Sequence, residues 1–254
     1  MISMSAKSIV QRKALKCIFC IGVLLSFACS SEQPNINDER FLTWRIGAAI
    51  SYNFPAEVSE AYGVNYQEDW TSVMLSYTNL NLGNRRNLNK IRERSYADYQ
   101  GYKLPLHSLI NFTPSQLGSG KKTLPDEIYI YWWVPNSRTN YATVVTVTEE
   151  MKAAMTRQYP NPSPRLKGQN CYQTDFLFGL LPDGRAKLWL KGCRIYTYVG
   201  VFEPTKVMLD PKSHLAENRL IPWNKVEQIW YDKELYRMQS LTDVTRELNT
   251  ETKQ

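Results

Sequence analysis

The chain has 254 residues, of which 43% are hydrophobic and 22% charged, and its formal net charge is +7. Four of these positive charges, and no acidic residue, lie within residues 1–28, so subtracting them leaves +3 for the rest. That ordinary charge excludes a strongly basic nucleic-acid footprint, and we expect no nucleic-acid partner. The roughly 225 residues that remain are enough to enclose one sizeable hydrophobic core.

Residues 1–28 have the pattern of a secretory signal. Basic side chains within residues 7–16 precede an apolar run at residues 17–25, which small residues follow. That run is too short to span a membrane as a helix. Cys29 comes directly after this segment and makes it resemble a bacterial lipoprotein signal, although Ser26 stands where such signals usually have leucine. A signal that is simply cleaved, or retained as a short anchor, is the alternative.

The lipoprotein interpretation sets the expected domain boundaries and location. Residues 29–40 are polar and lack a pattern, which indicates a lipidated tether beginning at Cys29. Residues 41–254 form the predicted single periplasmic domain, with a helical C-terminal segment. The residue after the cysteine is Ser30 and not aspartate, and in this the chain resembles the lipoproteins that are sorted to the outer membrane. We therefore expect an outer-membrane lipoprotein whose domain faces the periplasm.

A β-hairpin is predicted between residues 174 and 191. Pro182, Asp183 and Gly184 supply the turn, because proline presets the first corner, aspartate bonds its own backbone and glycine accepts a positive φ. The second arm, residues 185–191, alternates in the period of two that is typical of a strand with one buried face.

The hairpin also predicts a disulfide. Cleavage of the signal removes its two cysteines, and Cys29 is the expected site of lipidation. Cys171 and Cys193 therefore remain as an even pair. If Leu181 pairs with Arg185, these two cysteines are diagonal neighbours on one face, roughly 5–6 Å apart, which a disulfide requires. The oxidising periplasm favours the bond over the alternative of two free buried thiols.

The remaining strand candidates indicate a mainly β (α+β) domain, an antiparallel sheet or sandwich with a few short helices. Residues 127–134 are apolar on both faces, which predicts a central strand covered on both sides. Residues 54–58 interrupt the pattern near the start of the domain. The other strands are expected at residues 44–51, 70–77, 141–148 and 194–203.

Helices are expected in three places. Thr148 is a suitable N-cap for a short helix whose apolar stripe consists of Met151, Ala154 and Met155. Residues 224–236 and 241–248 are the other candidates, and the mixed charge of the last one predicts a peripheral helix.

A basic segment and many aromatic residues are the candidates for binding. The segment at residues 79–102 carries Arg85, Arg86, Arg92 and Arg94. The planar guanidinium of arginine forms two hydrogen bonds with a carboxylate at once, so we expect these arginines to contact an acidic partner. A solvated loop or exposed helix is the alternative. Tyrosine and tryptophan suit binding surfaces, but their strand patterns favour core and cross-strand positions.

The sequence provides no recognisable catalytic constellation. His107 and His214 lack a second histidine or a free cysteine at metal-ligand spacing, and the chain contains no G-x-S-x-G motif. Residues 117–123 superficially suggest a phosphate loop, but Ser115 and Lys122 occupy positions that require glycine and a hydroxyl. We therefore expect no enzyme activity, no metal and no cofactor. A hydrolase that works without histidine is the alternative.

Two stretches of the chain resemble a known family. Residues 124–133 (LPDEIYIYWW) and 178–192 (FGLLPDGRAKLWLKG) look like the domain of unknown function 2931, a family of small enterobacterial and related lipoproteins. The resemblance covers roughly residues 44–231, and its motifs are structural, strand–turn–strand.

The resemblance also carries a functional expectation. Members of the family are often encoded beside type VI secretion genes, near lipase-like effectors. This implies an immunity protein that binds an incoming phospholipase-like toxin and occludes its active-site mouth. The alternative is a structural or assembly lipoprotein with a resident partner in the envelope.

Overall fold

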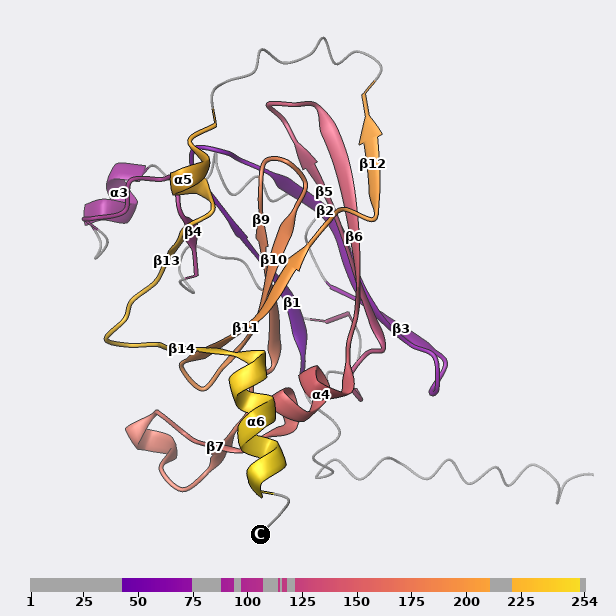
Figure 1. Ribbon diagram of the computed structural model, residues 1–254, viewed down its shortest axis with the longest axis vertical. Helices are drawn as coiled ribbons and strands as arrows, with labels where there is room; N and C mark the ends of the chain where they lie inside the picture. The colour runs from indigo at the N-terminus through magenta and orange to yellow at the C-terminus, as the bar shows by residue number, and fades with distance from the viewer. Residues whose placement is uncertain are drawn as a thin grey trace, which may run out of the picture. The chain divides into compact units, whose positions relative to one another are not determined.

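The computed structural model describes residues 43–74, 88–93, 97–106, 114, 116–117, 122–210 and 221–251. All of them belong to the unit Glu39–Gln254. Within these residues the strands form two five-stranded sheets and two small two-stranded ones, with short helices at their ends (Figure 1). This confirms the predicted mainly β fold.

The first five-stranded sheet, here called sheet I, contains the predicted hairpin. Its outer strands run parallel to their neighbours, and its inner pairs are antiparallel. The strand order is β1 (Arg45–Ile50), β9 (Asp175–Leu180), β10 (Ala186–Gly192), β11 (Ile195–Phe202) and β14 (Arg237–Ser240).

The second five-stranded sheet, here called sheet II, is antiparallel throughout. Its strand order is β12 (Lys206–Leu209), β6 (Thr139–Thr146), β5 (Glu127–Val134), β2 (Glu57–Asn65) and β3 (Trp70–Val73).

The shorter elements connect and cover these sheets. Strand β4 (Leu104–Pro105) pairs with β13 (Ile229–Trp230), and β7 (Tyr159–Pro160) pairs with β8 (Asn170–Cys171). The helices are α3 (Leu88–Glu93), α4 (Glu149–Thr156), α5 (Trp223–Val226) and α6 (Leu241–Glu251), with a 3-10 turn at Pro164–Leu166.

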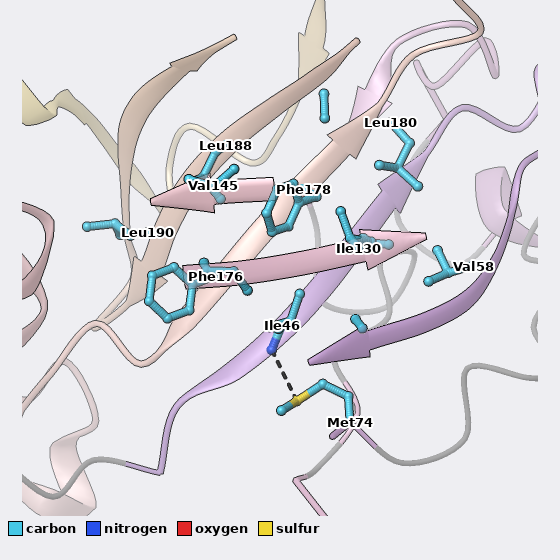
Figure 2. Packing of buried hydrophobic residues seen from close by; sticks show 14 of the residues in the cluster. Ile46, Val58, Met74, Ile130, Val145, Phe176, Phe178, Leu180, Leu188 and Leu190 are labelled. Atoms are coloured by element: carbon cyan, nitrogen blue, oxygen red, sulfur yellow. Dashed lines mark hydrogen bonds between the residues drawn. The ribbon is translucent and has the colours of Figure 1, made fainter. Parts of the chain in front are cut away.

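The main core lies between the two sheets. Alternate side chains of β1, β9 and β10 meet those of β2, β5 and β6, and each is almost completely buried, which contributes about 1.5–3 kcal/mol per large side chain. Met74 closes one end, where its sulfur accepts a hydrogen bond from the backbone amide of Ile46 at 3.5 Å. Figure 2 shows this packing for Ile46, Val58, Ile130, Val145, Phe176, Phe178, Leu180, Leu188 and Leu190.

The opposite face of sheet I is covered as well. Leu177, Trp189 and Tyr196 pack there against Leu104 and Val226, which come from β4 and α5. As a result, every residue of β9 is buried.

Sheet II differs, because only its inner face is fully buried. Along β5 the side chains alternate between buried and half-exposed, with Tyr129, Tyr131 and Trp133 at the half-exposed positions. The prediction of a central strand is confirmed by the place of β5 in the middle of the sheet. The prediction of cover on both sides is wrong, since the outer-face positions of β5 remain partly exposed.

The β9–β10 hairpin has the predicted register. The amide of Leu181 donates to the carbonyl of Arg185 at 2.9 Å, and Gly184 has a φ of +96°. Asp183 accepts a hydrogen bond from the amide of Arg185 at 3.1 Å, as expected of an aspartate in a turn. An added Cβ at Gly184 would also collide with the ring of Tyr141. Local turn chemistry therefore fixes this hairpin.

The predicted disulfide is present between Cys171 and Cys193. Their Cα atoms are 5.6 Å apart, within the range predicted from the register. Cys193 also lies in the two-residue turn between β10 and β11, together with Arg194, and both have positive φ values. The bond therefore joins the β10–β11 turn to the end of β8.

Two expectations about secondary structure were wrong. The predicted interruption at residues 54–58 contains the start of β2, in which a bulge between Val58 and Glu60 and the glycine at Gly63 disturb the apolar alternation. Gly63 is needed because an added Cβ would lie 2.5 Å from the ring of Trp44. The predicted helix at residues 224–236 reduces to the single turn α5, because Ile229 and the following residue pair with β4.

The other two helix predictions are confirmed in part or in full. Thr148 caps α4 by accepting a hydrogen bond from the amide of Met151, and the predicted apolar stripe of that helix is buried. Helix α6 is present and most of its residues are exposed, as expected of a peripheral helix. Val244, at 1% exposed, attaches it to the main core. Arg157 ties α6 to α4 through ion pairs with Glu247 and Glu251.

Candidate protein-binding surface

The outer face of sheet II carries a layer of aromatic side chains. The buried positions of β5 alternate with Tyr129, Tyr131 and Trp133, so these three side chains project from the face opposite the core. Tyr62 of β2 lies directly opposite Tyr129. Tyr66, just after β2, is 62% exposed. We call this set of five residues the aromatic face.

Ring stacking orders the aromatic face. The centroids of Tyr62 and Tyr129 are 4.7 Å apart with planes at 13°, and those of Tyr62 and Tyr131 are 6.1 Å apart at 24°. The hydroxyls of Tyr62 and Tyr131 are 3.3 Å apart and share a hydrogen bond. Burial, together with this hydrogen bond, raises the pKa of Tyr62 further above the neutral range, in which a phenol is already protonated. The result is a neutral, preorganised aromatic platform.

Glu127 fixes one end of the platform. Its Oε2 accepts hydrogen bonds from the hydroxyls of Tyr66 and Tyr129, both at 2.6 Å. The bond to this carboxylate is the main reason why the pKa of Tyr129 is raised. Neighbouring Asp126 accepts from the backbone amide of Tyr66 at 2.8 Å and from Lys152 at 2.9 Å, which anchors the same corner to α4.

The charge on this face is negative. Glu57 and Glu60 of β2 and Glu127 of β5 belong to it, whereas the sequences of β2, β3, β5 and β6 contain no lysine or arginine. Within the described part of the chain, neither Glu57 nor Glu60 forms an ion pair. The basic residue that the strands of sheet II place on this face is Lys206 of the edge strand β12, which pairs with Ala142. The face therefore combines aromatic rings with an excess of carboxylates.

The edge strand β12 continues sheet II beyond β6, and all four of its residues are exposed. Lys206 and Met208 pair with Ala142 and Asn140 on the outer face, whereas Val207 and Leu209 pair with Tyr141 and Thr139 on the core side. Its ends are attached to β6, through a hydrogen bond from the amide of Val144 to Thr205 and an ion pair between Arg138 and Asp210. An attached but exposed apolar edge is typical of a site for partner contact.

A cavity of about 620 Å³ lies elsewhere, between sheet I and the segment after α5. Trp189 and Tyr198 line it, and the ammonium of Lys187 donates to the backbone carbonyl of Glu227 there. Burial lowers the pKa of Lys187. The described residues around the cavity include neither histidine nor cysteine, so the lysine attaches the segment to the sheet and has no evident catalytic partner.

The basic segment singled out by the sequence is described only in part. Arg85, Arg86 and Arg94 lie outside the described residues, as does Cys29. The guanidinium of Arg92 donates to the carbonyl of Tyr99 at 2.9 Å and to the side chain of Gln100 at 2.7 Å. These contacts give Arg92 a role within the chain, and binding through the other three arginines stays a prediction.

His107 and His214 are outside the described residues. Among the described residues, no cluster of three His, Cys, Asp or Glu side chains is suited to hold a metal ion. The helices that are described are also too short or too polar to cross a membrane.

A family comparison covers most of the chain. The model of the family described as "Protein of unknown function (DUF2931)" matches residues 31–254. The chain belongs to this family. The DUF2931 match confirms the predicted resemblance and includes the whole aromatic face. No curated protein and no solved structure matches the chain.

Sequence reasoning identified the aromatic residues but not their role. The tyrosines were expected mainly in the core and in cross-strand pairs. They do form cross-strand pairs, such as Tyr62 with Tyr129, but on the half-exposed face. The available signal was the contrast within β5, where aliphatic residues and one tryptophan occupy one face while two tyrosines and a tryptophan occupy the other.

Proposed function

We propose that this DUF2931 protein is a periplasm-facing outer-membrane lipoprotein that acts as an immunity protein. It binds a type VI secreted, phospholipase-like antibacterial effector and neutralises it by covering the mouth of the active site. The observation that carries the proposal is the aromatic face, a preorganised, half-exposed layer of tyrosines on the sheet whose edge strand β12 is also exposed. Tyrosine and tryptophan dominate the energetics of many protein interfaces.

The disulfide and the N-terminal pattern support the location. The Cys171–Cys193 bond is stable in an oxidising compartment such as the periplasm. The signal pattern ending before Cys29 agrees with export and lipidation. Both features are expected of a binder that meets toxins arriving from outside the cell.

The physical design of the domain suits inhibition by binding. The packing of sheet II against sheet I and the stacking of its tyrosines keep the aromatic face ordered, which lowers the entropic cost of forming a complex. A lipid on Cys29 would hold the protein on the same membrane that a phospholipase attacks. Confinement to one surface raises the effective concentration of the inhibitor at its target.

The proposal is tested with the full-length protein, extracted from membranes in detergent with its disulfide intact and captured through a C-terminal tag. Candidate type VI lipase effectors are added, and phospholipase activity is measured as the protein is titrated. We expect a tight one-to-one complex in which the activity falls in step with binding. Recovery of resident envelope proteins alone, with effector activity unchanged, would overturn the proposal in favour of a structural or assembly role.

A further inference from the structure

We propose that the aromatic face binds a cationic, arginine-bearing protein segment, which lies across Tyr62, Tyr129 and Tyr131 between Glu60 and Glu127. The inference rests on the proposed function in taking the partner to be a protein. It deepens that function by assigning the chemistry of the partner's contact surface. The arginine segment at residues 79–102 predicts a partner with an acidic contact surface. The aromatic face instead predicts a partner with a basic one.

Charge complementarity is the first argument. The outer face of sheet II presents Glu57, Glu60 and Glu127. Against these three carboxylates, the strands of the sheet place one basic residue on that face, Lys206 of the edge strand β12, which is separated from Glu60 by β5 and β6. Complementary charges steer association and fix the orientation of partners. An anionic phospholipid surface would be repelled by the same carboxylates, so this face favours a basic partner.

The stacked tyrosines are the second argument. The faces of aromatic rings attract cations, and the guanidinium of arginine also stacks on them. The chain uses this contact elsewhere: Arg157 lies 5.5 Å from the ring centre of Tyr159, and Arg185 lies 5.6 Å from that of Trp223. Among the described cations, none lies over a ring of the aromatic face. A cation from a partner would meet the ring faces of Tyr129 and Tyr131 that do not stack on Tyr62.

The position of Glu127 is the third argument. Its Oε2 is held by the hydroxyls of Tyr66 and Tyr129, and no donor from the described residues reaches its other oxygen. That oxygen is fixed beside the ring stack. A guanidinium that stacks on Tyr129 can therefore bond to Glu127 as well, and such charge-assisted hydrogen bonds are among the strongest at interfaces.

The first experiment uses the full-length protein in detergent micelles and an octa-arginine peptide as the probe, with fluorescence of the aromatic side chains as the readout. We expect saturable binding that weakens about tenfold in the double variant Glu57→Lys/Glu60→Lys, in line with the loss of two exposed charge contacts. The matched control is Glu234→Lys, a reversal at an exposed glutamate in the loop between β13 and β14. An equal loss in the control would show non-specific charge attraction and overturn the inference.

Further probes distinguish other occupants. Octa-glutamate, phosphatidylglycerol in the same micelles and a neutral maltooligosaccharide are each titrated into the protein without octa-arginine, because the two anions would bind the cationic peptide itself. The inference requires that none of them binds in a way that depends on Glu57 and Glu60 or on the rings. Such binding by the lipid or the sugar would assign the face to a lipid or a glycan. Concentration-dependent self-association that blocks the peptide would assign it to a second copy of the chain.

A second variant tests the hydroxyl that orients Glu127. Tyr129→Phe keeps the ring but removes the hydroxyl that holds Glu127, so peptide binding should weaken less than in the double glutamate variant. Thermal unfolding of each variant verifies that it is folded. If the double glutamate variant neutralises an effector as well as the wild type, the inference fails while the proposed function stands. If no effector is neutralised but octa-arginine binding depends on these glutamates, the proposed function fails while the inference about the basic segment stands.

Discussion

The hydroxyl of Tyr129 donates a hydrogen bond of 2.6 Å to Glu127, two residues earlier on the same face of β5. This bond joins the two components of the candidate site, the ring stack and the negative charge. It also has a measurable consequence, because a carboxylate that accepts from a phenol favours the protonated phenol and raises the pKa of Tyr129.

Replacing Glu127 by glutamine tests this bond. The folded-state pKa of Tyr129 is raised above its unfolded value, so the bond stabilises the fold at neutral pH. That contribution is lost as the pH rises through the folded-state pKa. In Glu127→Gln we expect Tyr129 to ionise at lower pH, seen as an earlier rise in absorbance at the tyrosinate band during alkaline titration. Superimposable titration curves for the variant and the wild type would contradict the assignment.

The disulfide is expected to stabilise the domain. Cys171 and Cys193 are separated by 22 positions, and closing a loop of this size contributes about 3 kcal/mol in the chain-entropy model. The double variant Cys171→Ser/Cys193→Ser should lose about that much free energy of unfolding in urea. A reductant should destabilise the wild type to a similar extent and leave the double variant unchanged. If the reductant affects both proteins equally, the effect does not come from this bond.

The turn between β10 and β11 offers a stabilising substitution. Cys193 and Arg194 have φ values of 53° and 58°, a conformation that costs most L-residues free energy and that glycine adopts readily. Arg194→Gly should therefore stabilise the protein by about 0.5–1 kcal/mol in urea denaturation. The opposite change at the β9–β10 turn, Gly184→Ala, should destabilise it, because that glycine has a φ of +96° and packs against Tyr141. A loss of stability in Arg194→Gly would refute the account of the turn.

The ion pair between Asp126 and Lys152 predicts that the stability of the fold decreases at acidic pH. Burial alone would raise the pKa of Asp126, but hydrogen bonds from Lys152 and from the backbone amides of Tyr66 and Gln67 lower it on balance. A lowered folded-state pKa means that this stabilisation is present above the unfolded-state pKa and is lost as the pH falls through the folded-state value. Asp126→Asn should lower the melting temperature at pH 7 and change it little near pH 2. A uniform change at both pH values would contradict the linkage.

The sequence predicts those parts of the fold that are determined locally. The β9–β10 hairpin depends on Pro182, Asp183 and Gly184, and the start of α4 depends on Thr148, so neighbouring residues suffice to place both. The parallel pairing of β1 with β9 depends on contacts such as Arg45 with Asp175, 130 positions apart, which no local pattern reveals.

The candidate site was missed for a related reason. Composition drew attention to the arginines of residues 79–102, because a cluster of one charge is visible in the sequence. The aromatic face appears only when β2 is placed beside β5, which brings Tyr62 opposite Tyr129. The bulge near Val58 and the glycine at Gly63 obscured β2 itself, so the register could not be anticipated.

The most direct test of the account is oxidative footprinting of side chains in the complex with a captured effector. The full-length protein is exposed to hydroxyl radicals alone and with the effector, and the modified peptides are quantified. We predict that Tyr66, Tyr129 and Trp133 become protected, while Tyr102 and Trp230, which lie outside the aromatic face, react as before. Protection of Tyr102 and Trp230, with unchanged oxidation of the aromatic face, would contradict the claim that this face binds the partner.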